Sequence, residues 1–239
     1  MTTYVLVHGA WGGSYGWRKV RPLLAAAQHE VYTPSLTGIG ERSHLASPTV
    51  CLSTHIQDVA NTLFYEDLND IVLVGFSYGG MVVIGVADRM PERIRHLVYL
   101  DAFLPRDGQA VYSINAPPGT PPPAMPQPGE DWLVPPISRA FDNTEEQSWN
   151  AARRVFQPKG CFTEPIHLTR PLEEHAFSLT YIKATGDLRP ADGPQGFWPF
   201  ADRARTNARW RYREIDCDHM VLHKRPRELV QLLLEVEMG

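Results

Sequence analysis

The chain has 239 residues, 43% of them hydrophobic, and a formal net charge of −4 at pH 7. This length fits one large globular domain, and the weak acidic balance offers no basic footprint for nucleic acid. The sequence has no run of about 18 apolar residues, no signal-peptide pattern at its start, and three widely spaced cysteines that suggest neither disulfides nor a metal site. We therefore expect a cytoplasmic protein with no nucleic-acid or membrane partner, and the sequence indicates no particular oligomeric state.

Short apolar segments alternate with segments of helical periodicity along most of the chain. Such alternation predicts an α/β fold, with a mostly parallel six-stranded sheet and helices on both faces. Ligands of such sheets bind beyond the carboxyl ends of the strands. The expected strands are 3–9, 30–36, 70–76, 94–102, 179–187 and 209–216, and the expected helices are 17–28, 53–66, 81–90, 143–156 and 226–238.

One long segment, residues 104–179, has no clear strand pattern. Proline and glycine crowd its first half, 115–136, and exclude helix there. The second half contains a helix candidate, with Thr144 and Gln147 spaced as a capping box. A flexible linker between two domains is the alternative, but the strands that follow could not form a separate core. We expect a cap, 104–179, inserted into a core formed by 1–103 and 180–239.

The stretch Gly75-Phe76-Ser77-Tyr78-Gly79 matches the pattern G-x-S-x-G between an expected strand and an expected helix. In that context the pattern predicts a tight turn that exposes the hydroxyl of Ser77 above the sheet as a nucleophile. Small residues are needed on either side because larger side chains would collide with the turn. The alternative is a glycine-rich turn in which the serine only caps the helix.

A serine hydroxyl needs a general base, and the base needs a carboxylate that orients it. His219 follows the last expected strand and is our candidate base, with His223 as its rival. These two histidines could also be metal ligands, but no third ligand or H-E-x-x-H pattern accompanies them, so we expect no metal. Asp187 is the preferred acid because it ends a strand between the serine and the histidine, and Asp101 is the competitor.

An oxyanion hole requires two backbone N–H donors near the nucleophile. Tyr78 follows the serine, and Ala10 lies in the glycine-rich stretch after the first strand, so these two residues are our candidates. Trp11, Trp132 and Trp149 are candidates for an apolar substrate pocket, although aromatic residues of this kind more often belong to the core.

Together these segments resemble the α/β-hydrolase superfamily over nearly the whole chain. The resemblance is strongest to the branch of plant methylesterases, hydroxynitrile lyases and bacterial esterases. It rests on the stretches YVLVHGAWGGSYGW, RPLLAAAQHEVYTPSLTGIGER, VLVGFSYGGMV, YLDAFLPRDG and DHMVLHKRPREL. It implies an α/β-hydrolase fold and an enzyme without cofactor, with Ser77 as nucleophile, His219 as base, Asp187 as acid, and Ala10 and Tyr78 as oxyanion donors.

The resemblance also separates two reactions within that branch. The lyases carry a threonine where this chain has Gly9, and a lysine where it has Met220; the lysine supplies positive charge for the leaving cyanide. The resemblance therefore favours an esterase. Its candidate substrates are a small aromatic ester or a flat aromatic methyl carbamate of xenobiotic origin. The alternatives are a carbon–carbon lyase that uses the same triad, and a receptor of this fold with negligible turnover.

Overall fold

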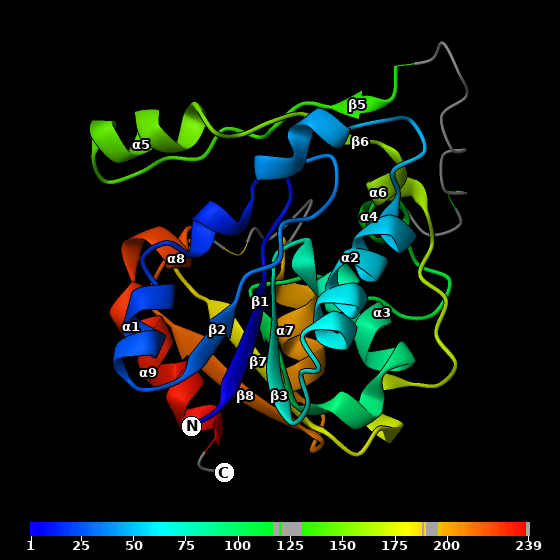
Figure 1. The fold of residues 1–239 in the computed structure, drawn as a ribbon, viewed down its shortest axis with the longest axis vertical. Coiled ribbons are helices and arrows are strands. Elements are labelled where there is room, and N and C mark those ends of the chain that lie inside the picture. The colour runs from blue at the N-terminus through cyan, green and yellow to red at the C-terminus, as the bar shows by residue number, and fades with distance from the viewer. Residues whose placement is uncertain (117–119, 121–130, 188, 190–195, 238–239) are drawn as a thin grey trace.

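A computed structural model describes residues 1–116, 120, 131–187, 189 and 196–237. Six strands form one sheet in the order β2-β1-β3-β4-β7-β8, and each neighbouring pair is parallel (Figure 1). All six lie where the sequence predicts strands, and the expected α/β fold is confirmed. Their bounds are β1 Thr3–Val7, β2 Glu30–Tyr32, β3 Ile71–Phe76, β4 Ile94–Leu100, β7 Ser178–Ala184 and β8 Trp210–Ile215.

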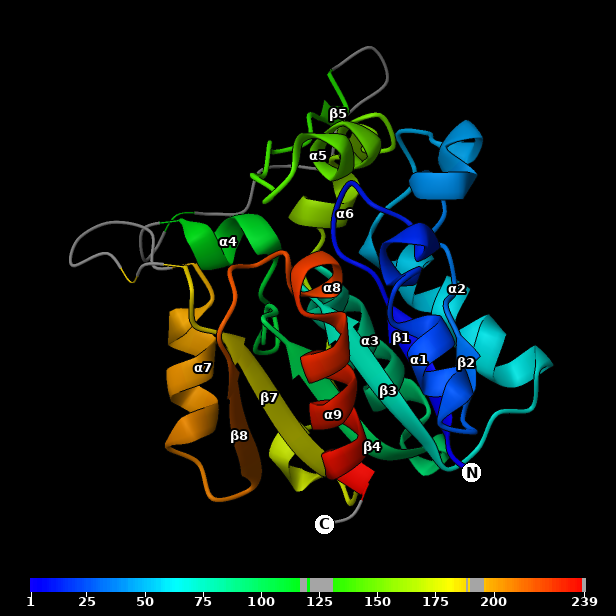
Figure 2. The ribbon, with the colours of Figure 1, turned by 90° about the vertical axis from the view of Figure 1, so that its left-hand side faces the viewer.

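Successive side chains of each strand point to opposite faces of the sheet, and helices cover both faces. In β1, Tyr4 and Leu6 belong to one apolar cluster, whereas Val5 and Val7 belong to the other. The first cluster packs under α1 and α9, and the second under α2, α3 and α7 (Figure 2). The bounds of these helices are α1 Arg21–Ala26, α2 Leu52–Tyr65, α3 Gly79–Arg89, α7 Trp198–Arg205 and α9 Pro226–Glu237.

The helices are less closely predicted than the strands. The single helix expected over 17–28 is a 3-10 turn, η1 (Ser14–Trp17), followed by α1, which carries Pro22 in its first turn. Further 3-10 segments lie at η2 (Gly40–Leu45) and η3 (Pro91–Arg93). Helices α7 and α8 (Val221–Lys224) were not expected. In the described residues no helix has both the length and the apolar character needed to cross a bilayer.

The chain between β4 and β7 contains α4 (Val111–Asn115), β5 (Leu133–Val134), α5 (Thr144–Ala151), β6 (Gln157–Pro158), α6 (Gly160–Thr163) and η4 (Leu172–Glu174). Strands β5 and β6 form a short antiparallel pair, so the expectation of no strand in this segment was wrong. The upper part of the segment lies above the carboxyl ends of the sheet strands (Figure 1). Most of the proline-rich part, 117–119 and 121–130, lies outside the described residues. The exact division into core and cap stays a prediction.

Helix α5 is attached to the core by a charged cluster around Glu146. The carboxylate of Glu146 is 2.6 Å from Nζ of Lys19 and 3.3 Å from Nδ1 of His223. Asn143 caps the helix, because its side chain accepts a 2.6 Å hydrogen bond from the backbone N–H of Glu146. The N-cap is therefore one residue earlier than in the expected Thr144–Gln147 capping box. One carboxylate thus connects α5 with the segment between η1 and α1 and with α8.

Candidate active site

Ser77 lies in the sharp turn between β3 and α3. Its φ is +57°, in the left-handed region that a residue with a side chain rarely occupies. The turn is held by hydrogen bonds of 3.3 Å from the Ser77 backbone N–H to the Leu100 carbonyl and of 3.2 Å from the Phe103 N–H to the Ser77 carbonyl. The strained backbone raises the hydroxyl above the carboxyl end of the sheet, as the G-x-S-x-G pattern predicts.

The glycines on both sides of Ser77 allow the close packing of this turn. A Cβ on Gly75 would lie 2.8 Å from the carbonyl oxygen of Gly79. A Cβ on Gly79 would lie 2.8 Å from the carbonyl oxygen of Val7 in the neighbouring strand. Because both obstacles are backbone atoms, a larger residue at either position would displace the strand or the helix.

His219 follows β8, and its imidazole reaches the hydroxyl of Ser77. The distance from Nε2 to Oγ of Ser77 is 2.9 Å. The other ring nitrogen, Nδ1, lies 2.7 Å from Oδ2 of Asp101, which comes directly after β4. With Nδ1 protonated, Nε2 is free to accept the serine proton, as a general base must. The structure therefore brings together hydroxyl, imidazole and carboxylate from the ends of three strands.

Two phenyl rings stack on the imidazole of His219. The ring of Phe76, immediately before the serine, lies 4.7 Å from it, and the ring of Phe197 lies 4.9 Å from it, with interplanar angles of 25° and 13°. These rings fix the orientation of the imidazole and surround it with apolar surface. Neither residue was expected at the site, because nothing in their local sequence relates them to the histidine.

Asp101 is fully buried, and a second buried charge accompanies it. Nζ of Lys183, in β7, lies 2.6 Å from Oδ1 of Asp101, and both side chains are at most 1% exposed. Burial alone would raise the pKa of Asp101, but the hydrogen bonds and charges of His219 and Lys183 outweigh it, so the pKa lies below its ordinary value. Asp101 is therefore a carboxylate at neutral pH, with one oxygen on the lysine and the other on the histidine.

The sequence analysis did not identify Lys183, although a charged residue is unusual at this position. It is a charged residue in the apolar strand LTYIKA, where a side chain is buried on either face. Its ammonium also lies 4.6 Å from the centre of the Trp198 ring and donates to the carbonyl oxygen of Ala184. A buried lysine in a central strand predicts a buried carboxylate nearby.

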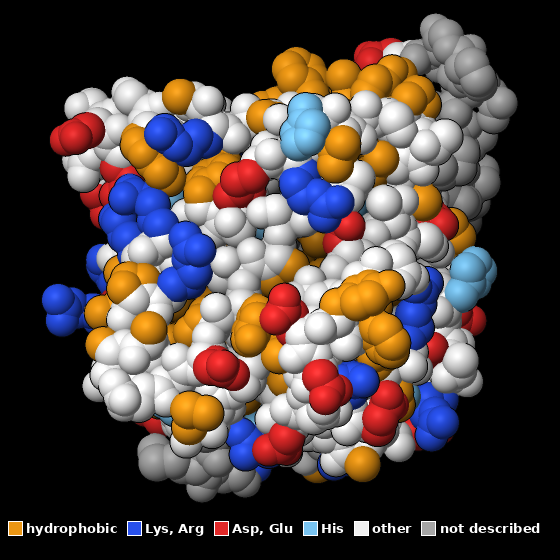
Figure 3. All heavy atoms as spheres, in the orientation of Figure 1, with side chains coloured by type: hydrophobic (Ala, Val, Ile, Leu, Met, Phe, Trp, Pro, Cys, Tyr) orange, Lys and Arg blue, Asp and Glu red, His pale blue; other side chains and the backbone are white. Residues whose placement is uncertain are grey.

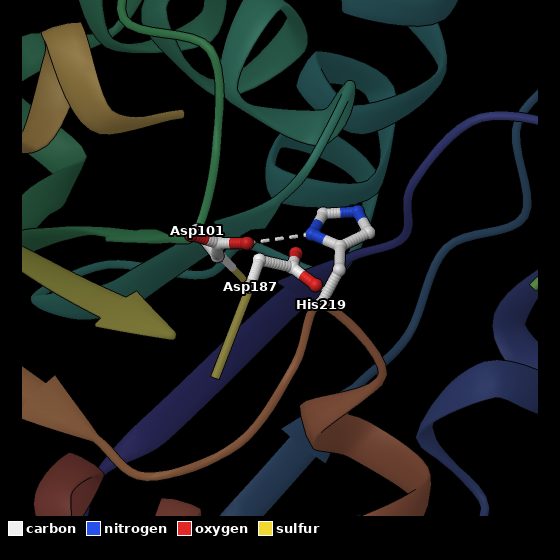
Figure 4. A group of neighbouring side chains, drawn as sticks. All are labelled: Asp101, Asp187 and His219. Atoms are coloured by element: carbon white, nitrogen blue, oxygen red, sulfur yellow. Dashed lines mark hydrogen bonds and ion pairs between the residues drawn. The ribbon is translucent and has the colours of Figure 1, made fainter. Parts of the chain in front are cut away.

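Asp187, the acid preferred from the sequence, lies beside the histidine without a hydrogen bond to it. One carboxylate oxygen of Asp187 lies within 4.8 Å of the ligand atoms of Asp101 and His219. Figure 4 shows all three side chains, with the hydrogen bond running between Asp101 and His219. The competitor Asp101 thus occupies the position that we expected for Asp187. The reason is geometric: Asp101 follows its strand at once, whereas Asp187 comes three residues after β7 ends.

Among the described residues, Asp101, Asp187 and His219 form the only group of three or more potential metal ligands. The ammonium of Lys183 contacts one member of this group directly, and its positive charge opposes a cation at that place. Nδ1 of His219 is engaged by the carboxylate of Asp101. We therefore assign Asp101 and His219 to the hydrogen-bond chain with Ser77, and Asp187 lies beside it.

The rival histidine, His223, lines the same cavity but makes its hydrogen bonds to the cap helix and not to the serine. Its ring nitrogens face Glu146 at 3.3 Å and Asn150 at 3.4 Å. Burial lowers the pKa of His223 to about 4, against the opposing effect of Glu146. His223 is thus a neutral residue that contacts the cap helix.

The candidate oxyanion donors flank the serine. Tyr78 is the next residue in the chain, and Ala10 follows Gly9, which packs so tightly on Ser77 that a Cβ on Gly9 would lie 2.9 Å from the Cβ of Ser77. Ala10 lines the cavity above the serine. The placement of both residues agrees with an oxyanion hole at this end of β1 and β3, and the role itself stays a prediction.

A cavity of about 60 Å³ lies over Ser77 and His219. Trp11 lines it, whereas Trp132 and Trp149 are not among its described lining residues. The ring of Trp149 packs instead between the guanidinium groups of Arg18 and Arg153, at 3.9 and 4.1 Å. Polar residues unexpectedly line the cap side of the cavity: Arg139, Asn150 and Arg154.

Comparisons with known proteins agree with this fold. The chain is 35% identical to a carbendazim hydrolyzing esterase from Nocardioides sp. (strain SG-4G), over 98% of both chains. It is 39% identical to an alpha-hydroxynitrile lyase from Arabidopsis thaliana, but over only 43% of this chain and 40% of the lyase. An extracellular alpha/beta-hydrolase from a Paenibacillus species superimposes with a TM-score of 0.78 and 26% identity, over 98% of both chains.

Family membership follows from a match over almost the entire sequence. Residues 4–232 match the alpha/beta hydrolase family, and this span contains all of the six-stranded sheet except Thr3, together with all residues of the hydrogen-bond chain. The protein belongs to the alpha/beta hydrolase family.

Proposed function

We propose that this protein is a serine esterase that hydrolyses small esters or methyl carbamates through an acyl-enzyme intermediate. The observation that carries the proposal is the continuous hydrogen-bond chain from Ser77 through His219 to Asp101, mounted on a strained turn. The full-length similarity to an esterase that hydrolyses carbendazim supports the inclusion of carbamates and of xenobiotic substrates. A cytoplasmic location stays a prediction.

The geometry suggests the following reaction. Oγ of Ser77 attacks the carbonyl carbon while Nε2 of His219 takes its proton, and the carboxylate of Asp101 stabilises the imidazolium. The N–H groups of Ala10 and Tyr78 hold the oxyanion. The carbon–oxygen bond to the alcohol then breaks, and the alkoxide takes the proton from His219. Water, deprotonated by His219, attacks the acyl-enzyme, and the serine is released with its proton.

A lyase reaction is less well supported by the side chains around the base. Met220 follows His219, is buried, and lines the cavity where the related lyases carry a lysine. The ammonium of Lys224, four residues further on, is engaged at 2.7 Å by Asp218 and at 2.9 Å by Asp142. Neither residue provides a free ammonium beside the base for a leaving cyanide.

Steady-state hydrolysis of 4-nitrophenyl acetate tests the proposal, followed by a panel of aryl methyl carbamates. We expect multiple turnovers that are lost in Ser77→Ala. Cyanide release from mandelonitrile, measured on the same preparations, tests the lyase alternative. Turnover of mandelonitrile but of no ester would overturn the proposal, and so would ester turnover that persists in Ser77→Ala.

A further inference from the structure

The cavity over Ser77 has arginine side chains on the side formed by the cap segment. Arg139 and Arg154, from the cap segment, line it together with the catalytic residues, and none of the described lining residues is an aspartate or a glutamate. Two of the histidines in the lining, His8 and His223, do not add to this charge, because burial lowers the pKa of His8 and lowers that of His223 to about 4. Arg139 and Arg154 therefore supply the guanidinium groups of the lining, whereas the carboxylate of Glu146 contacts the lining residue His223 at 3.3 Å.

Arg154 has no counter-ion among the described residues. Its Nε is shielded from solvent and has no hydrogen-bond partner, and its guanidinium carbon lies 5.5 Å from the ring centre of Trp11. Burial lowers the pKa of Arg154, and the charge of Arg139 lowers it further. Two guanidinium groups thus line the same cavity with no carboxylate partner among the described residues, an arrangement that a bound anion would stabilise.

Other cations of this region are compensated. Lys19 and Arg18 lie 2.6 and 3.7 Å from Glu146, and Lys224 is paired with two aspartates. Arg153, the neighbour of Arg154, donates a hydrogen bond of 2.8 Å to the Trp149 carbonyl, and its guanidinium group stacks on the Trp149 ring. On the face shown in Figure 3, Lys and Arg side chains gather below α5. Arg139 and Arg154 differ from Lys19, Arg18 and Lys224 in having no carboxylate partner among the described residues.

We propose that Arg154, assisted by Arg139, forms a carboxylate-binding subsite, so that the substrates are short esters that also carry a free carboxylate. The inference rests on the proposed esterase function and narrows its substrate class. A planar guanidinium binds a carboxylate through two parallel hydrogen bonds and thereby fixes its orientation. Because the cavity holds about 60 Å³, the carboxylate and the scissile ester must be separated by only a few bonds.

A matched pair of substrates tests this subsite. Monomethyl succinate carries the carboxylate, and dimethyl succinate has the same chain with the charge removed; the release of methanol measures the hydrolysis of each. We expect the wild-type kcat/KM to be about tenfold or more higher for the charged ester, through a lower KM, and the preference to fall as salt is added. Equal kcat/KM values for the two esters would overturn the subsite.

Variants assign the preference to the arginine. Arg154→Met should abolish it by raising KM for the charged ester alone, Arg154→Lys should keep part of it, and Arg139→Met should reduce it. Arg153→Met is the matched control, because it removes the same charge one residue away from the cavity and should leave the preference unchanged. An equal loss for both esters in the folded Arg154 variants would indicate a structural role and contradict the proposal.

Binding to Ser77→Ala separates this inference from the proposed function. Monomethyl succinate and dimethyl succinate are compared by calorimetry in Ser77→Ala with and without Arg154→Met. Arg154-dependent binding of the monoester, with no ester hydrolysed by the wild type, would retain the subsite and reject the esterase. Hydrolysis of neutral esters, with no Arg154-dependent binding of the monoester, would retain the esterase and reject the subsite.

Discussion

Nδ1 of His219 lies 2.7 Å from Oδ2 of Asp101, although the two residues are 118 positions apart in the sequence. This contact sets the tautomer of the imidazole, and we expect Asp101→Asn to lower kcat roughly 10³-fold or more, because an amide favours the wrong tautomer. Asp187→Asn should lower kcat by less than about tenfold, since Asp187 contributes charge near the ring but no hydrogen bond to it. Steady-state kinetics on both variants decide between the two acids, and a larger loss in Asp187→Asn would reverse the assignment.

Ser77→Ala should abolish esterase turnover and leave the fold intact. Removing a nucleophile of this kind costs roughly 10³- to 10⁶-fold in kcat. The left-handed φ of +57° at this position is unfavourable for both residues, so the stability change should be small. Circular dichroism and a thermal melt check the fold, while a burst of product in the wild type and none in the variant would report the acyl-enzyme.

Lys183→Met should destabilise the protein by roughly 3 kcal/mol, because it leaves the carboxylate of Asp101 buried without its cation. Urea denaturation at neutral pH measures the loss. Arg205→Met, which removes an exposed ion pair with Asp202, should cost less than about 1 kcal/mol and serves as the comparison. The double variant Lys183→Met/Asp101→Asn should recover part of the stability; strict additivity would argue against coupling between the two charges.

Gly9→Ala should lower kcat by about tenfold or more, because its Cβ would lie 2.9 Å from the Cβ of Ser77 and 3.2 Å from the ring of Phe76. Gly12→Ala is the control, since its nearest neighbour would lie at an ordinary 3.6 Å. The kcat values of both variants on one ester provide the comparison. An unchanged kcat in Gly9→Ala would show that the turn accommodates the added methyl group.

Stability should fall as the pH decreases from about 6.5 to about 4. His55 is fully buried between the Tyr78 hydroxyl at 2.9 Å and the Thr37 carbonyl at 2.8 Å, and burial lowers its pKa from 6.5 to about 4. In this window the unfolded chain binds a proton at His55 that the folded chain does not, so acid favours unfolding, by up to about 3 kcal/mol from this residue. Urea denaturation at pH 7 and pH 5 measures the slope, which should be flatter in His55→Gln; an identical slope would exclude His55 as its source.

The sheet and the position of the site could be predicted from the sequence for a simple physical reason. A strand buried on both faces requires a nearly continuous apolar run, and Ile71–Phe76 is such a run, ended by a serine between glycines. Because parallel strands end at one edge, the residues after three of them were expected together there. Ser77 and His219 meet as expected.

The choice of acid and the character of the cavity were beyond sequence reasoning. Asp101 and Asp187 both follow strands, and only the direction of each side chain, which the neighbouring Lys183 helps to set, distinguishes them. The cap has little hydrophobic periodicity, so nothing in its sequence indicated that Arg154 lines the cavity over Ser77 while Trp149 is not among the described lining residues.

The distribution of the hydrogen-bond chain over β3, β4 and β8 has a consequence for folding experiments. Ser77 and His219 are 142 positions apart, and each becomes functional only when its own strand has docked in the sheet. A partly folded chain that has formed β1 to β4 but not yet added β7 and β8 has the nucleophile without its base. Recovery of catalysis during refolding therefore records the closure of the last edge of the sheet, later than signals that report secondary structure alone.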